Sequence, residues 1–285
     1  MGSGSYSVDN RAFRATTMGY HTKSTHEIFT KKSVDALMDP KNTEIRESRD
    51  SSEHPESISI VLGLDVTGSM GSIPHQLVKD GLPNIMGRII QVGVRDPQLL
   101  FLGIGDHECD RYPLQIGQFE SSDELMDKWL TSIYLEGGGG GNEGESYLIA
   151  WYYAGLKTSI DCFEKRNQKG FLFTIGDEKT LKSLPASSLL RVFGNGQYQD
   201  YSAAELLDKA MGKYHVFHLH LKQGHNGNSP EVMGDWKQLI GENLIIVDDK
   251  EEIQRIIPEI ITSKLGVVDQ KKDPVVYEQK EEMML

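Results

Sequence analysis

The stretch of sequence that decides the fold reads ISIVLGLDVTGSM and spans residues 58–70. It begins with a short, mostly apolar run rich in β-branched side chains, which is typical of a strand buried on both faces. Strands of this kind belong to parallel sheets that helices cover on both sides. The run ends at Asp65, and the hydroxyl residues Thr67 and Ser69 follow it. The stretch therefore predicts a central strand that ends in a polar turn.

Outward from this strand, apolar runs alternate with segments of helical periodicity. Further strands are predicted at residues 98–105, 115–119, 170–175, 214–221 and 244–247. Helices are predicted at residues 73–92, 122–133, 143–160, 203–211, 231–240 and 251–265. This alternation predicts a doubly wound α/β fold with a mostly parallel sheet of about six strands and helices on both faces.

The two ends of the chain differ in composition from the middle. Residues 1–56 are polar and carry few large apolar side chains, so we expect a partly irregular N-terminal extension with at most a short helix within residues 26–40. Residues 57–265 form the predicted α/β domain. Residues 266–285 are charged and interrupted by proline, which predicts a C-terminal tail.

Composition limits the classes of function. The formal net charge of the 285-residue chain is −12, and an acidic surface repels nucleic acid and anionic lipid at long range. The longest apolar run is about seven residues, against ~20 for a bilayer span. We therefore expect neither a nucleic-acid nor a membrane partner, and the polar first residues predict a cytoplasmic location. Cys109 and Cys162 form no CxxC pair and are predicted to be reduced thiols.

Carboxylates and hydroxyls recur after the predicted strands, at the edge where open α/β sheets bind ligands. Asp65, Thr67 and Ser69 follow the first strand, and Asp177 follows the strand at residues 170–175. These side chains offer only oxygen, which suits Mg²⁺ better than zinc. Asp106, after the second strand, is a candidate to line the same crevice, as a direct ligand or as a carboxylate behind the ligands.

The motif Asp65-Val66-Thr67-Gly68-Ser69 resembles the metal-ion-dependent adhesion site of von Willebrand factor A domains, whose first motif is Asp-x-Ser-x-Ser. Asp177 matches the later strand-end Asp of that family. Residues 139–145 resemble the Gly-Gly-Gly-Asp-x-Pro-Glu loop of some intracellular and bacterial members, which puts Asn142 in the third ligand slot. This chain departs from the family there, because Asn142 offers a neutral carbonyl.

The resemblance covers about residues 57–265 and implies a binding module rather than an enzyme. In that family a divalent cation, Mg²⁺ with Mn²⁺ or Ca²⁺ as alternatives, is completed by a carboxylate from a partner protein. Intracellular and bacterial members often serve MoxR-type AAA+ ATPases, which makes such an ATPase the partner class that the resemblance suggests. The implied metal ligands are Asp65, Thr67, Ser69, Asn142 and Asp177.

Three other interpretations remain open at the level of sequence. Asp-x-Thr-Gly-Ser also resembles the phosphorylation loop of haloacid-dehalogenase-type phosphotransferases, in which Asp65 would be the nucleophile. A structural assembly protein with a vestigial site is a second alternative. Thr67 and Ser69 could simply cap the next helix. Among the aromatic residues that follow the glycines, Tyr147 is placed to reach the rim of the site.

Overall fold

The computed structural model describes residues 4–136 and 144–267, with the backbone alone for Ser69 and Gly71. Its centre is a six-stranded sheet in the order β10-β9-β6-β2-β3-β4. The strands are β2 (Ser57–Asp65), β3 (Asp96–Ile104), β4 (Leu114–Ile116), β6 (Gly170–Gly176), β9 (Tyr214–Leu221) and β10 (Leu244–Val247). All neighbours are parallel except β3 and β4. Every residue of β2 is buried, as its apolar sequence predicts.

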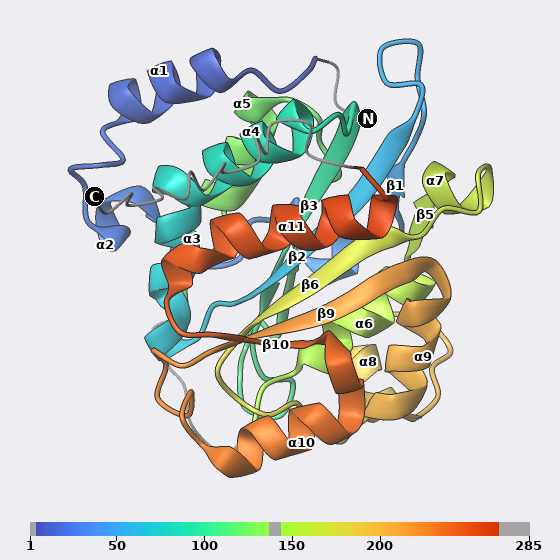
Figure 1. Cartoon of the computed structure of the whole chain (residues 1–285). Helices are drawn as coiled ribbons and strands as arrows, with labels where there is room; N and C mark the ends of the chain where they lie inside the picture. Colours follow the sequence, from blue (N-terminus) through green and yellow to red (C-terminus); the bar gives the residue numbers. More distant parts are fainter. Residues whose placement is uncertain (1–3, 137–143, 268–285) are drawn as a thin grey trace, which may run out of the picture.

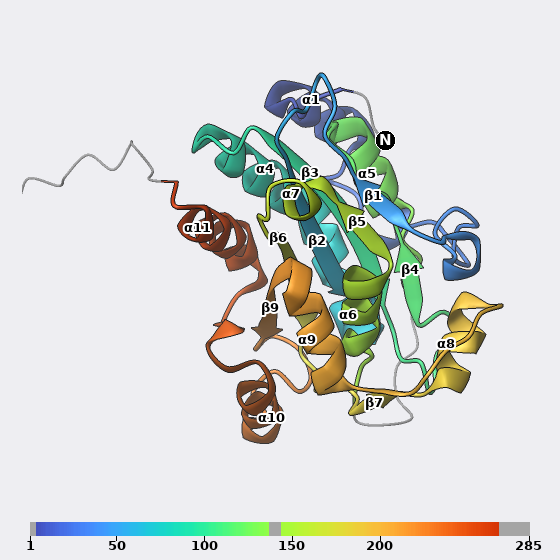
Figure 2. The ribbon, with the colours of Figure 1, turned by 90° about the vertical axis from the view of Figure 1, so that its right-hand side faces the viewer.

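Helices cover both faces of this sheet. On one face α4 (Leu82–Gln91) packs against α11 (Ile253–Leu265), and on the other α6 (Tyr147–Leu156) packs against α9 (Ala203–Lys213) (Figures 1 and 2). The predicted doubly wound α/β fold, with a mostly parallel sheet of six strands, is therefore confirmed.

The other elements are mostly short. The helical ones are α1 (Val8–Met18), α2 (Thr25–Ile28), η1 (Pro40–Asn42), η2 (Gly68–Gly71), α3 (Ser72–Gln76), η3 (Leu77–Gly81), α5 (Asp123–Thr131), α7 (Asp161–Glu164), α8 (Ala186–Phe193), α10 (Pro230–Ile240), η4 (Gly241–Asn243) and η5 (Lys250–Glu252). Two small sheets pair β1 (Arg46–Ser48) with β5 (Thr158–Ile160) and β7 (Ser183–Leu184) with β8 (Tyr201–Ser202).

The order of the strands places a ligand-binding crevice. The chain goes from β2 to β3 on one side, and it later returns to β6 on the other side of β2. The carboxyl ends of β2 and β6 therefore flank a topological switch point, where open α/β sheets bind ligands. Leu64 of β2 lies opposite Ile175 of β6, so the residues that follow both strands emerge side by side.

Some boundaries differ from the sequence prediction. The helix expected over residues 143–160 begins at Tyr147 and ends at Leu156. Its last expected turn is instead β5, which pairs in parallel with β1. The residues of β5, Thr-Ser-Ile, include two β-branched side chains, which favour strand over helix. The helix expected over residues 73–92 is formed, and a π-helical segment, η3, lies between its α-helical parts α3 and α4.

The segment before Ser57 contains a helix that the sequence analysis did not predict. Helix α1 buries two residues, Arg11 and Ala15. The Arg11 guanidinium lies 2.7 Å from Asp127 of α5 and donates a second hydrogen bond to the carbonyl of Val78. The Tyr20 hydroxyl donates to the other oxygen of Asp127 at 2.6 Å. The N-terminal helix is thus held to the domain by a buried charge; the proposed division at residues 56 and 265 stays a prediction.

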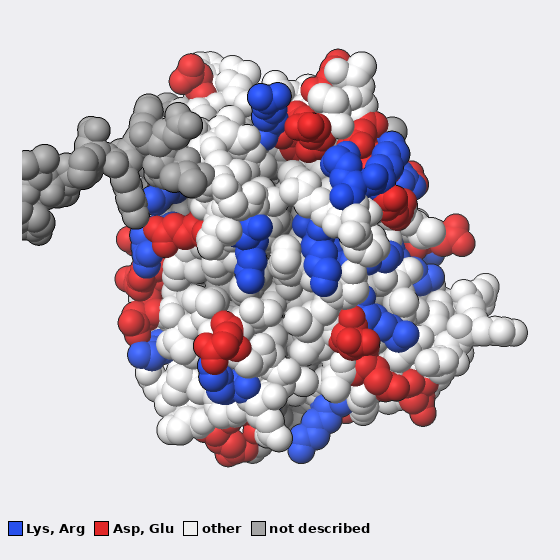
Figure 3. All heavy atoms as spheres, turned by 45° about the vertical axis from the view of Figure 1, so that its right-hand side comes forward, with Lys and Arg blue, Asp and Glu red and all other residues white. Residues whose placement is uncertain are grey.

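Two surface properties bear on the sequence expectations. Within residues 4–136 and 144–267, no helix combines the length and apolar character that crossing a bilayer requires. On the face shown in Figure 3, the described basic and acidic side chains are interspersed rather than gathered into one patch. Both cysteines are free thiols, Cys109 exposed and Cys162 buried, as predicted.

Candidate functional site

The carboxyl ends of β2 and β6 bring two carboxylates into the interior. Asp65 is the last residue of β2, and Asp177 directly follows β6. Each is only 1% exposed. A Cβ atom on Gly176, the residue before Asp177, would lie 3.0 Å from Oδ2 of Asp65, so the two strand ends are neighbours, and the charge of Asp177 acts on the pKa of Asp65. The structure therefore brings together Asp65 and Asp177 as the sequence predicts.

The turn after β2 folds back onto Asp65. Oδ1 of Asp65 accepts the backbone N–H of Thr67 at 2.9 Å and the Thr67 hydroxyl at 2.6 Å. Thr67 occupies the N-cap position of η2, yet its side chain makes no capping hydrogen bond. Helix capping therefore does not explain this threonine. Its hydroxyl serves the carboxylate, which is the arrangement expected of a shared oxygen site.

Tyr147 holds the second oxygen of Asp65. Its hydroxyl donates to Oδ2 at 3.0 Å, from the first residue of α6. The ring packs edge-on against His218 and Trp236, whose own rings stack 3.5 Å apart. Burial holds the pKa of His218 well below its usual value. This neutral aromatic cluster fixes Tyr147 and confirms that it reaches the site.

Among the described residues, Asp65 has hydrogen-bond donors but no cationic partner. Burial, more than any other effect, raises the pKa of Asp65 to about 7, and the charge of Asp177 adds to the rise, while the bonds from Thr67 and Tyr147 oppose it. No described Lys or Arg side chain forms an ion pair with Asp65. Burying a carboxylate without a positively charged partner costs free energy. A cation bound at this edge of the sheet would offset that cost.

Asp177 is enclosed by the loop that follows β9. Its Oδ2 accepts the backbone N–H of Asn226 at 3.2 Å. A Cβ atom on Gly224 would lie 2.1 Å from that oxygen, so only glycine fits at this position. A Cβ atom on Gly176 would likewise lie 1.9 Å from the Tyr147 hydroxyl oxygen. These glycines let backbone pass directly against the carboxylates.

Glu145 is a residue of the site that the sequence analysis did not single out. It is 7% exposed, and its Oε2 atom has no hydrogen-bond partner. Burial, together with the charges of Asp65, Asp110 and Asp106, raises the pKa of Glu145 to about 10, while the Thr67 hydroxyl acts in the opposite direction. The available signal was its match to the final Glu of the Gly-Gly-Gly-Asp-x-Pro-Glu loop that residues 139–145 resemble.

Asp106 lies near the site, but its hydrogen bonds are made to residues of its own loop. Its Oδ1 accepts the N–H of Glu108 at 2.7 Å, and its own N–H donates to Asp110 at 2.7 Å. A hydrogen bond with Asp106 is the main reason that the pKa of Cys109 is raised to about 11, so this thiol is a poor nucleophile. Asp106 acts on the site through its charge, which contributes to the raised pKa of Glu145.

Two predicted ligands lie outside the described residues: the side chain of Ser69, and Asn142 in the glycine-rich loop. Over the described parts of the chain, no three His, Cys, Asp or Glu side chains are arranged to hold a metal ion. The described residues among the predicted ligands are Asp65, Thr67 and Asp177, which together offer carboxylate and hydroxyl oxygens, the hard ligands that suit Mg²⁺.

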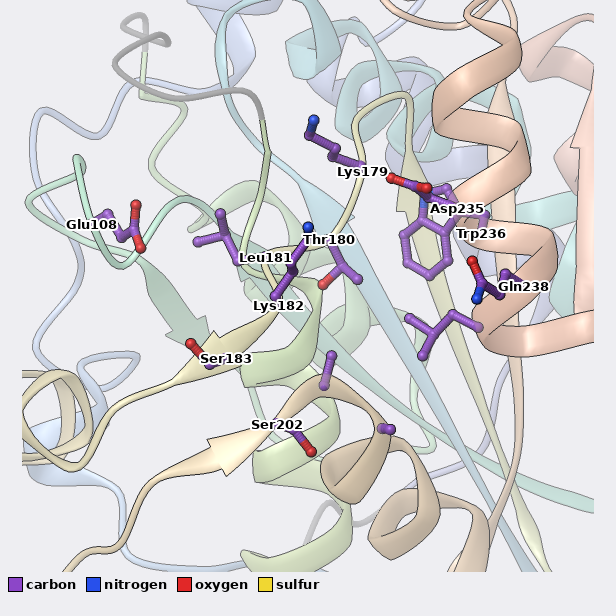
Figure 4. A pocket seen from close by; sticks show the side chains of 13 residues that line it. Glu108, Lys179, Thr180, Leu181, Lys182, Ser183, Ser202, Asp235, Trp236 and Gln238 are labelled. Atoms are coloured by element: carbon purple, nitrogen blue, oxygen red, sulfur yellow. The ribbon is translucent and has the colours of Figure 1, made fainter.

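A cavity of about 710 Å³ adjoins this edge of the sheet (Figure 4). Its lining includes Trp236 of α10 and the segment 179–183, with Ser202 and Ala203 at the start of α9. The cavity shares two walls with the carboxylate cluster. Trp236 stacks on His218, and the backbone of Glu145 exchanges hydrogen bonds with Lys179 and Leu181.

Comparisons with known proteins do not assign the chain to a family or a function. No family model matches the chain, and no curated protein matches it. Among solved structures, the pilus adhesin SpaC from Lactobacillus rhamnosus GG in its open conformation is similar at 10% identity and a TM-score of 0.49, over 79% of this chain and 31% of that one. A second crystal structure of SpaC gives 9% identity and a TM-score of 0.47, over 79% and 32%. This chain thus spans about a third of the length of the adhesin.

Proposed function

We propose that this chain is a metal-dependent protein-binding module of the von Willebrand factor A type, with a divalent cation, Mg²⁺ foremost, at the carboxyl ends of β2 and β6. The observation that supports it most is the carboxylate of Asp65, which is 1% exposed and accepts hydrogen bonds from Thr67 and Tyr147 but has no cationic partner among the described residues. A bound cation would supply the missing charge.

Each residue has a distinct part in this proposal. Asp65 and the Thr67 hydroxyl would hold the cation, and Asp177 would act directly or through water, as in the family that the sequence resembles. Tyr147 orients Asp65 through the hydrogen bond to Oδ2. The bound cation supplies an electrophilic position for a carboxylate of a partner protein. The partner class that the resemblance suggests is a MoxR-type AAA+ ATPase.

The phosphotransferase alternative would make Asp65 a nucleophile rather than a metal ligand. The burial of Asp65 and its bonds from Thr67 and Tyr147 apply equally to both interpretations. Beryllium fluoride, which mimics an aspartyl phosphate, distinguishes them: under the metal-site proposal it should leave the Tm of the protein in Mg²⁺ unchanged. A rise in Tm that Asp65→Asn abolishes would favour the enzyme instead.

Titration calorimetry of chelator-stripped protein with Mg²⁺ and Mn²⁺ tests the proposal. We expect binding heat in the native protein and none in Asp65→Asn, which keeps the size of the side chain. Asp35→Asn is the matched control, because Asp35 pairs with Lys31 in the N-terminal segment and should not alter the heat. Absence of heat with both metals in the native protein, or equal heat in Asp65→Asn, would refute the metal site.

Partner binding is tested separately with immobilised protein. A partner held by a metal-bound carboxylate should elute with chelator and should not bind to Asp65→Asn, while the variant keeps its fold by circular dichroism. Retention of the same partner after chelation would show that the interaction does not use the cation.

A further inference from the structure

Glu145 is placed at the site by backbone hydrogen bonds on both sides. Its N–H donates to the carbonyl of Lys179 at 2.9 Å, and its carbonyl accepts the N–H of Leu181 at 3.0 Å. The next residue, Ser146, donates its N–H to Gly105 at 3.3 Å and accepts a hydrogen bond from the N–H of His107 at 2.7 Å. The segment is thus anchored to the loops after β3 and β6, which fixes where the side chain of Glu145 begins.

The carboxyl group of Glu145 is buried close to other acidic residues. The charges of Asp65, Asp110 and Asp106 act on its pKa, and a hydrogen bond with the Thr67 side chain opposes them. One oxygen, Oε2, is buried and has no hydrogen-bond partner, although the residue is more than nine-tenths buried. No described Lys or Arg side chain forms an ion pair with Glu145. A buried carboxyl group that keeps one oxygen without a partner, with other carboxylates acting on it, costs free energy, so packing alone does not account for it.

We propose that Glu145 is a ligand of the cation, completing with Asp65 and Thr67 the set for which the sequence analysis chose the neutral amide of Asn142. This inference rests on the proposed function, since it assumes that the same cation binds. The inference adds one feature to the proposed function: the protein itself supplies an additional charged ligand to the cation. Charged ligands strengthen binding of divalent cations, so the isolated chain binds metal without help from a partner's carboxylate.

The test compares metal affinity in the native protein, Glu145→Gln and Glu231→Gln by calorimetry with Mg²⁺ and Mn²⁺. Glu231 is the matched control, because it is exposed and pairs at 3.7 Å with Lys179 of the adjoining segment. We expect Glu145→Gln to weaken binding by at least about tenfold and Glu231→Gln to leave it unchanged. Equal affinity in Glu145→Gln and the native protein would overturn the assignment.

The design separates this inference from the proposed function. If the native protein binds no metal, both fail. If the native protein binds metal, Asp65→Asn does not, and Glu145→Gln binds as well as the native protein, only the role of Glu145 fails. The Tm of each stripped variant reports folding. Where Glu145→Gln does not fold, Glu145→Met keeps the volume without a polar group, and the same loss of affinity is expected; an unchanged affinity overturns the role.

Discussion

Two buried carboxylates in this molecule, Asp127 and Asp65, have opposite surroundings. Asp127 of α5 is 5% exposed and accepts hydrogen bonds from Arg11 and Tyr20. Asp65 is 1% exposed and accepts them from Thr67 and Tyr147. Burial raises the pKa of both, but at Asp127 the charge of Arg11 is the chief opposing effect, whereas at Asp65 the neighbouring charge of Asp177 adds to the rise.

The difference separates a structural charge from a candidate binding charge. Arg11 comes from α1 and joins the N-terminal helix to the domain, so the paired carboxylate holds the fold together. The carboxylate at the sheet edge lacks such a partner and sits at the switch point of the strand order. If this contrast is correct, breaking the paired site should damage stability, and neutralising the unpaired one should not.

The largest effect is expected at the paired site. Arg11→Met should lower the free energy of unfolding by about 3–5 kcal/mol, because it leaves Asp127 buried without its cation. Denaturant unfolding at neutral pH measures this. Arg14→Gln is the control: the Arg14 side chain is 29% exposed and lies 3.1 Å from Asp123, and its loss should cost less than about 1 kcal/mol. Equal costs for the two variants would show that the buried pair does not anchor α1.

The unpaired site should respond in the opposite direction. The folded-state pKa of Asp65, about 7, lies above its unfolded value near 3.8, so the folded protein binds more protons between these values. Stability of the metal-free protein should therefore fall as pH rises from 4 to 7. Asp65→Asn removes the part of this dependence that Asp65 causes, but not the part from Glu145, whose pKa is also raised, and it should be more stable than the native protein at pH 7 by roughly 2–4 kcal/mol.

Unfolding of both proteins in chelator across this pH range measures the difference. The two curves should approach each other near pH 4 and coincide below it, where the carboxyl group is protonated in both states. Curves that stay parallel to pH 7 would contradict an unpaired Asp65.

The two regions also show what sequence could and could not predict. The apolar runs at residues 58–64 and 170–175 predicted β2 and β6, and strand-end logic then brought Asp65, Thr67 and Asp177 together. Helix α1 was missed because its buried face is Arg11 and Ala15 rather than an apolar stripe. Glu145 lies in the loop at residues 139–145 that resembles the family motif, but the ligand position there was assigned to Asn142. Hydrophobic periodicity predicts where apolar side chains are buried, and it is silent on polar ones that tertiary contacts bury.

A smaller effect tests the packing around Asp177. Gly224→Ala should lower the free energy of unfolding by about 1–3 kcal/mol, because the new Cβ overlaps the carboxylate of Asp177 and must displace it. The same displacement should weaken metal binding. Gly234→Ala is the control, since nothing lies within 4 Å of its Cβ position and it is inside α10, where alanine should stabilise by about 0.5–1 kcal/mol. If Gly224→Ala is as stable as Gly234→Ala, the loop after β9 moves to accommodate the new Cβ without a measurable loss of stability.

The smallest effect concerns the hydroxyl that orients Asp65. Tyr147→Phe removes the hydrogen bond to Oδ2 and should cost about 1 kcal/mol at neutral pH. Because that bond opposes the rise in the pKa of Asp65, its loss should move the pH-dependent fall in stability to higher pH. Tyr153→Phe is a close match: Tyr153 is buried on the same helix, and its hydroxyl has no hydrogen-bond partner, so its removal should cost nothing and leave the pH profile in place. If Tyr147→Phe behaves like Tyr153→Phe, the tyrosine merely fills space beside Asp65. If only Tyr147→Phe shifts the profile, the hydroxyl tunes the carboxylate, which is the property that separates a prepared binding site from a packed core.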